Sequence, residues 1–262
     1  TLWLTRMWME TLFDNGTHKN LLLEDFGHGE MVQANVHLIV DSGKGMILDP
    51  GGHKVFKHLL QEIGTIIGVD NLQWIFFSHQ DPDIVAAANG WLMTTKAYAL
   101  ASKLWLRFIP HFGVDRLVVD RIIGLDDEGA IIKLGNTDLY ILPAHWLHSP
   151  GNFQVYDPVS KILYSGDLGA SLGQDYTYVQ NFEEHIKYME GFHKRYINSG
   201  RALKNWAKMV RQLDIDTIAP QHGAIFKGKD MVNKFINWVE NLETGIDIMD
   251  DVYKIPTKRL TV

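Results

Sequence analysis

The stretch "FFSHQDPDI", residues 76–84, places His79, Asp81 and Asp83 two residues apart, directly after the apolar run "LQWIFF". A buried strand followed by a loop predicts a sheet edge from which polar side chains project. In an extended or irregular turn alternate side chains converge on one side, and Pro82 disfavours a helical conformation for Asp81. Histidine and carboxylate both bind metals, so the stretch indicates a metal-binding turn. Two simpler interpretations remain open, namely an acidic loop and a helix capped by Asp83.

Composition excludes several other classes of protein. The 262 residues are 46% hydrophobic and carry a formal net charge of −6 without a basic run, which argues against nucleic-acid binding. The longest apolar runs are strand-sized, far short of the roughly 20 residues of a membrane-spanning helix. The N-terminal residues lack the layout of a signal peptide, so we expect a cytoplasmic protein. Cysteine is absent, whereas twelve histidines favour a metal held by imidazole and carboxylate.

Strand and helix patterns occur in two series along the chain. "ANVHLIVDSGKGMILDPGG" predicts a hairpin that ends at Asp49, "HKVFKHLLQEIG" a helix that stops near Gly64, and "DIVAAANGWLM" a helix that begins at Asp83. Further strands are expected at "AYALAS", "IIKL", "DLYILPA", "NFQVYD", "KILYSG" and "DTIAP", and helical patterns cover roughly 181–213 and 230–242. Because no linker rich in Pro, Gly or Ser divides the chain, we expect one domain over residues 1–262, with two sheets flanked by helices.

Five metal-ligand side chains each follow the C-terminal end of an expected strand. They are Asp49 in "ILDPGG", His79 in "FFSHQD", His148 in "PAHWLHSPGN", Asp167 in "YSGDLG" and His222 in "APQHGA". Loops at one edge of a rigid sheet are where metal ligands usually gather. Each residue also has a simpler interpretation, since Asp167 could be a turn residue and a lone histidine is more often packed than metal-bound. Together the five favour a metal site at this edge.

These residues together resemble the metallo-β-lactamase fold superfamily, whose pattern is an Asp after an early strand, HxHxDH, a later His, a bridging Asp and a final His. The order matches from about residue 30 to residue 226. Asp81 replaces the second histidine of HxHxDH, and Ile84 replaces the last. A carboxylate at the first of these positions is similar to the flavodiiron branch, which carries HxExDH and holds two irons. The segments "SKLWLRFIPHFG", "LHSPGNFQVYD" and "SGDLGAS" most resemble the stand-alone oxygen-binding di-iron proteins related to that branch.

The resemblance implies an αββα sandwich of two mixed sheets flanked by helices, without a flavodoxin module. It also implies a ligand set, in which His79, Asp81 and His148 bind one metal, Asp83 and His222 bind the other, and Asp167 bridges them. Asp49 would orient a ligand or a bound water. The metals implied are two iron ions, with zinc or manganese as alternatives, and no flavin is expected in this chain. A homodimer is also expected, because such relatives often pair.

A ligand pocket is expected beside the second metal. Ile84 cannot bind a metal and would leave an open coordination position for dioxygen or nitric oxide. Aromatic side chains near the ligands could form the wall of this pocket, although core or surface positions are equally typical of them. These are Trp146 and Phe153 around His148, and Tyr176 and Tyr178 after Asp167. His28 in "GHGEM" is a further candidate, because flavodiiron relatives have a histidine in that region.

Charge favours iron over zinc at such a site. The carboxylate of Asp81, unlike a neutral histidine, lowers the electrostatic cost of oxidising two ferrous ions. Zinc gains less, because it does not change its charge and an added anionic ligand makes it a weaker Lewis acid.

Three functions remain open from the sequence. The first is a di-iron protein that binds dioxygen or nitric oxide as a sensor or signalling component. The second is an oxygen or nitric oxide reductase, which would need an external electron donor because the chain has no glycine-rich phosphate loop for a flavin. The third is a metal-dependent hydrolase, such as a phosphodiesterase, lactonase or thioesterase, in which the metal would activate water. No residue is expected to act as a catalytic nucleophile.

Overall fold

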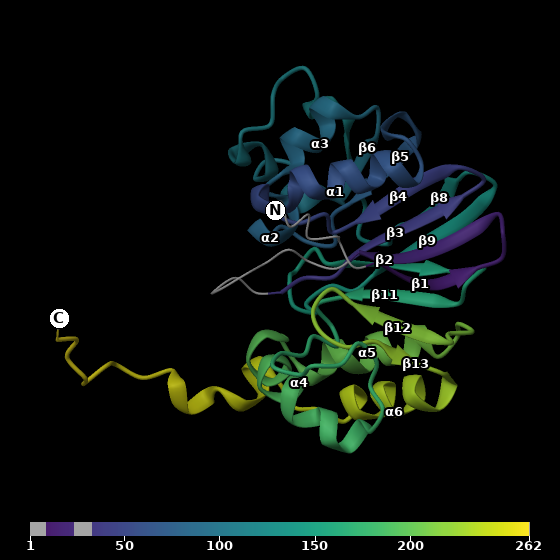
Figure 1. The fold of residues 1–262 in the computed structure, drawn as a ribbon. Coiled ribbons are helices and arrows are strands. Elements are labelled where there is room, and N and C mark those ends of the chain that lie inside the picture. Colours follow the sequence, from purple (N-terminus) through teal and green to yellow (C-terminus); the bar gives the residue numbers. More distant parts are fainter. Residues whose placement is uncertain (1–8, 24–32, 262) are drawn as a thin grey trace, which may run out of the picture.

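The computed structural model describes residues 9–23 and 33–261. Within these ranges the strands form two sheets packed face to face, with helices on both outer sides (Figure 1). The N-terminal sheet has the strand order β1-β2-β3-β4-β5-β6-β7, and the C-terminal sheet has the order β13-β12-β11-β10-β9-β8. This architecture confirms the αββα sandwich expected from the sequence.

The N-terminal sheet is antiparallel at one side and parallel at the other. Strands β1 to β4 pair antiparallel, and β5, β6 and β7 then join in parallel. All six residues of β3 are buried, as its mainly apolar sequence predicts for a strand covered on both faces, and the buried six include the polar residues His37 and Asp41. The strands are β1 Met9–Asp14, β2 His18–Leu23, β3 Val36–Asp41, β4 Lys44–Leu48, β5 Leu72–Phe76, β6 Tyr98–Ser102 and β7 Ile122–Leu125.

The C-terminal sheet is mixed in the same way. Strands β8 to β11 pair antiparallel, β12 lies parallel to β11, and β13 closes the edge antiparallel to β12. Its strands are β8 Ala130–Leu134, β9 Thr137–Pro143, β10 Phe153–Asp157, β11 Ile162–Gly166, β12 Thr217–Pro220 and β13 Phe226–Lys227.

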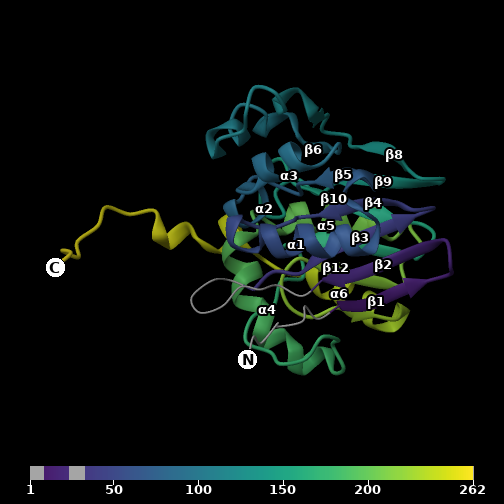
Figure 2. The same cartoon turned by 45° about the horizontal axis from the view of Figure 1, so that its top comes forward.

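Helices cover the outer face of each sheet (Figures 1 and 2). The first set is α1 His53–Ile66, α2 Pro82–Val85 and α3 Ala88–Thr94, and the second set is α4 Phe182–Tyr196, α5 Gly200–Val210 and α6 Lys229–Glu240. Short 3-10 turns are η1 Val69–Asn71, η2 Lys103–Trp105, η3 Ile109–Phe112, η4 Val119–Arg121, η5 Gly245–Ile248 and η6 Asp250–Val252. Within the described ranges, no helix has both the length and the apolar character needed to cross a membrane.

Three apolar layers hold the sandwich together. One lies between the N-terminal sheet and its helices, where Leu59 and Trp91 are buried, and another lies between the C-terminal sheet and α4 to α6 around Phe235. The third fills the space between the sheets and includes Phe76 and Phe153. This packing fixes the strand ends, from which the candidate metal ligands project.

Local expectations differ from the structure in several places. The single helix expected from Asp83 is instead two short helices, α2 and α3, because the backbone of Ala87 departs from helical dihedral angles between them. Helix α2 begins at Pro82, after Asp81 in an extended conformation. The pattern over 181–213 also forms two helices, since the chain is extended at Ile197 and restarts at the cap of α5. Helix α1 continues past its expected stop to Ile66, and strands β1, β2, β7 and β13 were not expected.

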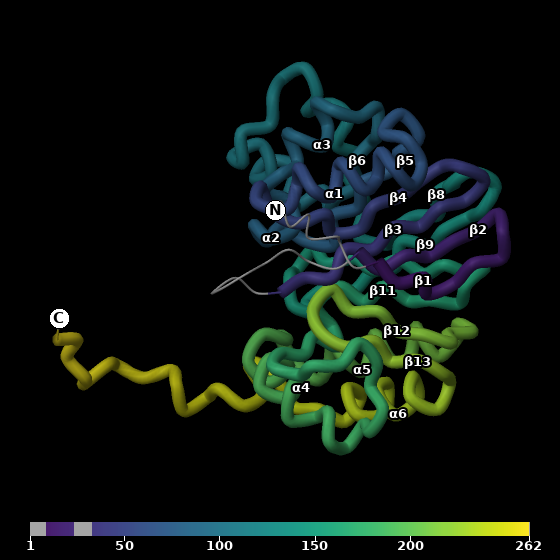
Figure 3. Tube along the Cα trace, viewed as in Figure 1, coloured from purple at the N-terminus to yellow at the C-terminus, as the bar shows by residue number. Residues whose placement is uncertain are grey.

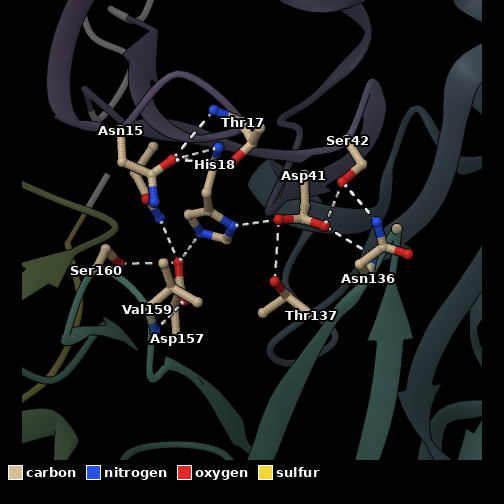
Figure 4. Close-up of polar contacts among 12 residues, drawn as sticks. Asn15, Thr17, His18, Asp41, Ser42, Asn136, Thr137, Asp157, Val159 and Ser160 are labelled. Atoms are coloured by element: carbon tan, nitrogen blue, oxygen red, sulfur yellow. Dashed lines mark hydrogen bonds and ion pairs between the residues drawn. The ribbon is translucent and has the colours of Figure 1, made fainter.

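A buried polar network around His18 joins the two sheets (Figure 4). It lies at the end of the sandwich opposite the metal-ligand loops, because Asp41 pairs with Lys44 at the start of β4, whereas Asp49 follows the end of β4. Both ring nitrogens of His18 on β2 face carboxylates, with Nδ1 2.9 Å from Asp41 Oδ1 and Nε2 2.6 Å from Asp157 Oδ2. Asn20 donates to Asp157 Oδ2 at 2.8 Å, and Thr137 donates to Asp41 Oδ1 at 3.0 Å. Because carboxylates only accept hydrogen bonds, both ring nitrogens of His18 carry protons and the ring is a cation.

Candidate metal centre

The loops that follow four sheet strands bring the expected ligands to one edge of the sandwich. Asp49 follows β4, His79 follows β5, Asp167 follows β11 and His222 follows β12, while His148 lies in the longer loop after β9. Helix α2, which contains Asp83 in its first turn, lies at the same edge (Figures 1 and 2). The structure therefore brings to one edge the side chains that the strand-end argument singled out.

Four of the expected ligands converge in one group. Their ligand atoms, from His79, Asp81, His148 and Asp167, all lie within 4.8 Å of one another. His148 Nε2 is 2.9 Å from Asp167 Oδ2 and 3.5 Å from Asp81 Oδ2, and His79 Nε2 is 3.4 Å from Asp81 Oδ2. Two imidazoles and two carboxylates around one point form a donor set that suits iron, manganese or zinc.

A second group shares Asp167 with the first. His222 Nε2 is 3.5 Å from Asp167 Oδ1 and 3.4 Å from Asp83 Oδ2. The other oxygen of the same carboxylate, Oδ2, faces His148 and lies 3.6 Å from His79 Nε2. The two oxygens of Asp167 therefore face two different ligand sets, which is the arrangement a bridging carboxylate requires.

Two buried atoms in this cluster show that the residues suit a metal. His79 Nε2 and Asp167 Oδ1 are inaccessible to solvent and have no hydrogen-bond partner among the described residues. A buried polar atom without a partner is costly, and metal coordination would satisfy both atoms. The donor set and these unpartnered atoms together fit the pair of metal ions implied by the sequence.

Hydrogen bonds outside the cluster orient the histidine rings. His79 Nδ1 lies 2.9 Å from Ser78 Oγ, and the backbone N–H of Ser78 donates to Asp49 Oδ1 at 2.8 Å. His222 Nδ1 donates to the carbonyl of Gln33 at 2.6 Å. These bonds direct Nε2 of each ring toward Asp167. The sequence predicted a supporting role for Asp49, which stays a prediction, and did not point to Ser78 or to the Gln33 carbonyl. The only signal for Ser78 was its place beside His79.

The carboxylates control the protonation of the histidines. Burial lowers the pKa of His148, but the hydrogen bonds that its ring donates to Asp167 and Asp81 outweigh burial and raise the pKa to about 10. Burial also lowers the pKa of His222, but Asp83 and Asp167 outweigh it and raise the pKa to about 9. Each ring must therefore lose a proton before its Nε2 can bind a metal.

The pKa values of Asp81 and Asp167 are lowered, whereas that of Asp49 is raised. The neighbouring histidines hold the pKa of Asp81 and of Asp167 below the usual range, although burial opposes the shift. Burial raises the pKa of Asp49 to about 7, against the hydrogen bond from Ser78 and the charge of His79. Positive charge beside the cluster would favour the ionised form of all three carboxyls.

A pocket of about 670 Å³ opens over the cluster. Its floor contains Asp81, Asp83, His148, Asp167 and His222, and its walls are Ala170, Leu172, Gly191, Phe192, Arg195 and Tyr196. The rings of Phe192 and Tyr196 stack 4.9 Å apart and present edges to the His148 ring. Sequence reasoning missed this aromatic wall, although the i, i+4 spacing of two aromatics on one helix was a usable signal.

The aromatic side chains expected in the pocket lie elsewhere. Trp146 is 48% exposed and lines a separate hollow with Met209. Phe153 is buried between the sheets. Tyr176 donates or accepts a hydrogen bond with His185 Nδ1 at 2.8 Å, and Tyr178 donates to Glu10. Hydrogen bonds hold Tyr176 and Tyr178, and the core between the sheets holds Phe153, outside the cluster.

Two further residues, Ile84 and His28, were also expected in the pocket. Ile84 is fully buried in the core layer beneath α1 and α3 and does not line the pocket. Its apolar side chain fills the core of this layer. It offers no atom that could bind a metal. His28 lies outside the described residues.

Known proteins resemble this chain over most of its length. The family model described as ODP family beta lactamase matches residues 32–223. A solved structure of chemotaxis sensor ODP as a peroxy diiron species is 41% identical, with a TM-score of 0.84 over 94% of this chain and 99% of that chain. The apo state of chemotaxis sensor ODP from T. denticola is 38% identical, with a TM-score of 0.85 over the same shares.

More distant similarities extend to a solved flavo di-iron structure and to a curated sequence. A mutant of the flavo di-iron protein from Thermotoga maritima is 21% identical, with a TM-score of 0.73 over 90% of this chain and 61% of that chain. An uncharacterized protein of Methanocaldococcus jannaschii is 25% identical over 233 residues, which are 86% of this chain and 58% of that protein. The chain thus spans little more than half the length of this curated relative.

Proposed function

Because the chain belongs to the family described as ODP family beta lactamase, we propose that it binds two iron ions in the His/Asp cluster and dioxygen at that site. The observation that carries the proposal is the position of Asp167, whose two oxygens face two separate ligand sets. The proposed ligands of the first iron are His79, Asp81, His148 and Asp167, and those of the second are Asp83, His222 and Asp167. A chemotaxis sensor ODP of 41% identity was solved as a peroxy diiron species, which supports iron and dioxygen here.

The residues around the cluster would shape this binding. A pair of ferrous ions held by these residues would supply the electrons that binding of dioxygen needs. Asp81, in place of a neutral histidine, adds negative charge that favours the oxidised pair. Phe192 and Tyr196 cover His148 with apolar surface and restrict water beside the cluster. Nitric oxide, which is also a diatomic ligand, could occupy the same position.

The proposed role is that of a sensor or signalling component. Reduction of dioxygen or nitric oxide to product would need an external electron donor, whereas binding needs none. Supplying reduced flavoprotein or rubredoxin separates these roles. A sensor consumes about one dioxygen per site and then stops, whereas a reductase consumes ligand continuously. The cytoplasmic location expected from the sequence stays a prediction that cell fractionation can check.

A homodimer is part of the proposal, and the C-terminal segment that follows Met249 supports it. This segment extends away from the rest of the fold (Figures 1 and 3). Its apolar side chains are uncovered, with Val252 61%, Tyr253 77%, Ile255 89% and Leu260 92% exposed. A second copy that covered them would recover hydrophobic free energy. Light scattering should give twice the chain mass for the full chain and the monomer mass after truncation at Met249. An unchanged mass would contradict this role of the segment.

Metal analysis followed by an oxygen titration tests the main proposal. We expect protein purified without oxygen and supplied with ferrous iron to hold two irons per chain. Adding dioxygen should then produce a visible absorption band, and the band should not form in protein loaded with zinc. Two tightly held zinc ions that iron cannot replace would contradict the proposal.

A further inference from the structure

A buried histidine with no assigned role lies on the helix that covers the metal-ligand loops. His193 on α4 has no exposed surface and is surrounded by Phe192, Phe235 and Trp238, with ring centroids 5.4, 6.4 and 5.2 Å away. Burial among these rings lowers its pKa to about 4, so the imidazole is neutral at physiological pH.

The two hydrogen bonds of this ring define its tautomer. His193 Nδ1 is 2.7 Å from the carbonyl oxygen of Met189, which can only accept, so the proton is on Nδ1. Nε2 is therefore unprotonated and accepts the backbone N–H of Gly169 at 2.9 Å. The ring is thus a fixed acceptor directed at the loop after β11.

That loop contacts two of the three residues that would hold the second metal, Asp167 and His222, whereas the third, Asp83, lies on α2. Gly169 is two residues beyond Asp167, whose carbonyl accepts the N–H of Ala170 at 2.9 Å. Two residues further, the N–H of Ser171 donates to the carbonyl of His222 at 3.2 Å. Gly169 has a φ of +97°, and a Cβ there would come 2.9 Å from a ring carbon of Pro220, so the loop has little room to shift.

The first metal is supported differently. His79 and Asp81 lie in the loop after β5, and His148 lies in the loop after β9. Among the proposed ligands of the first metal, only Asp167 lies in the loop after β11, to which His193 is hydrogen-bonded. A change at His193 should therefore affect the second metal more than the first.

We propose that His193 is a positioning residue, whose Nε2 holds the Gly169 N–H and thereby fixes Asp167 Oδ1 and the His222 loop for the second metal. The inference rests on the proposed two-metal site, but it does not require that the metal be iron or that dioxygen bind. Loss of a comparable supporting hydrogen bond typically costs 10- to 100-fold in metal affinity.

Three variants test this role. His193→Phe keeps the ring packing and removes the acceptor, whereas His193→Gln offers an amide oxygen to the Gly169 N–H. His185→Phe is the matched control, because His185 is a second buried histidine of α4 whose Nδ1 contacts Tyr176 rather than a ligand loop. If His193→Phe does not fold, the flexible His193→Met carries the same test.

The measurements are zinc titration of metal-free protein and hydrogen exchange of the Gly169 amide. For His193→Phe we expect the first zinc to bind within about threefold of wild type, the second at least tenfold more weakly, and the Gly169 amide to exchange faster. His193→Gln should recover most of the second-site affinity, and His185→Phe should change stability but neither zinc affinity. Wild-type affinity for both zincs in His193→Phe, or equal weakening in His185→Phe, would overturn the proposal. Because zinc is the probe, failure of the iron and dioxygen proposal would leave these outcomes unaffected.

Discussion

Asp167 Oδ2 lies 2.9 Å from His148 Nε2, although the two residues follow different strands, β11 and β9. The other oxygen of Asp167 faces His222, 3.5 Å away. One carboxylate therefore joins ligands from three loops, and both proposed metal positions depend on it.

Replacing this carboxylate should abolish the paired site. Asp167→Asn removes one negative charge and leaves an amide nitrogen or oxygen toward each ligand set, so we expect weakened binding at both positions and no oxygen-dependent band. Asp83→Asn affects only the second set and should leave about one metal per chain. Metal analysis after desalting measures both variants. Two retained irons in Asp167→Asn would show that the carboxylate does not bridge.

The identity of residue 81 should set the preference for iron. Asp81 Oδ2 lies within 3.5 Å of both His79 and His148, so its charge acts directly on the first position. We expect Asp81→His to bind zinc in preference to iron when equal amounts are offered, because the charge that stabilises oxidised iron is lost. Asp81→Glu, which keeps the charge, is the control. An unchanged metal preference in Asp81→His would contradict this explanation.

Metal binding should release protons at neutral pH. The pKa values of His148 and His222 are raised to about 10 and about 9, so both rings are protonated in metal-free protein at pH 7. Each must lose its proton to bind a metal, so affinity at the second position should rise about tenfold per pH unit below the raised pKa of His222. The rise should be at least as steep at the first position, because Asp167 and Asp81 also raise the pKa of His79 against the effect of burial. A pH dye in weakly buffered solution measures the protons released when zinc is added. Absence of proton release at pH 7 would contradict the assignment of these rings as ligands.

The polar network around His18 should stabilise the fold in a defined pH range. Burial lowers the pKa of His18, but hydrogen bonds to Asp157 and Asp41 outweigh it and raise the pKa, so its contribution is complete below pH 6.5 and is lost as pH rises through the raised pKa. The pKa values of Asp41 and Asp157 are lowered, so their contribution is present above pH 3.8 and is lost as pH falls through those values.

His18→Gln should therefore lower the free energy of unfolding by about 3 kcal/mol at pH 5.5 and by less at pH 9, because it leaves buried carboxylates without a cation. Urea denaturation of metal-free protein at the two pH values provides the measurement. The matched control is Asp138→Asn, which breaks an exposed ion pair with Lys133 and should cost less than about 1 kcal/mol. An equal cost at both pH values would show that the charge of His18 is not what matters.

The sequence predicted the elements that depend on local pattern. Alternating and continuous apolar runs located β3 to β6 and β8 to β12, and the proposed ligands come after four of these strands, β5, β9, β11 and β12. Strand β2 was missed because its buried polar residues, His18 and Asn20, interrupt the apolar pattern and gain their partners from other strands, namely β3, β10 and β11. Such long-range partners cannot be seen from local periodicity.

The pocket wall was mispredicted for a related reason. Proximity in sequence to His148 and Asp167 suggested Trp146 and Tyr176, but the pocket is lined by Phe192 and Tyr196 from α4. Their position depends on how α4 packs over the C-terminal sheet, which tertiary contacts decide. The same packing brings His193 to Gly169, a contact between residues 24 positions apart.

The central claim is that this chain holds two irons that together bind dioxygen. The most direct measurement is titration of dioxygen into anaerobic protein of known iron content, followed by visible absorption. The account predicts a band that grows until about one dioxygen has been added per two irons and that is absent in Asp167→Asn. A wild-type protein with two irons and no change on adding dioxygen would contradict it.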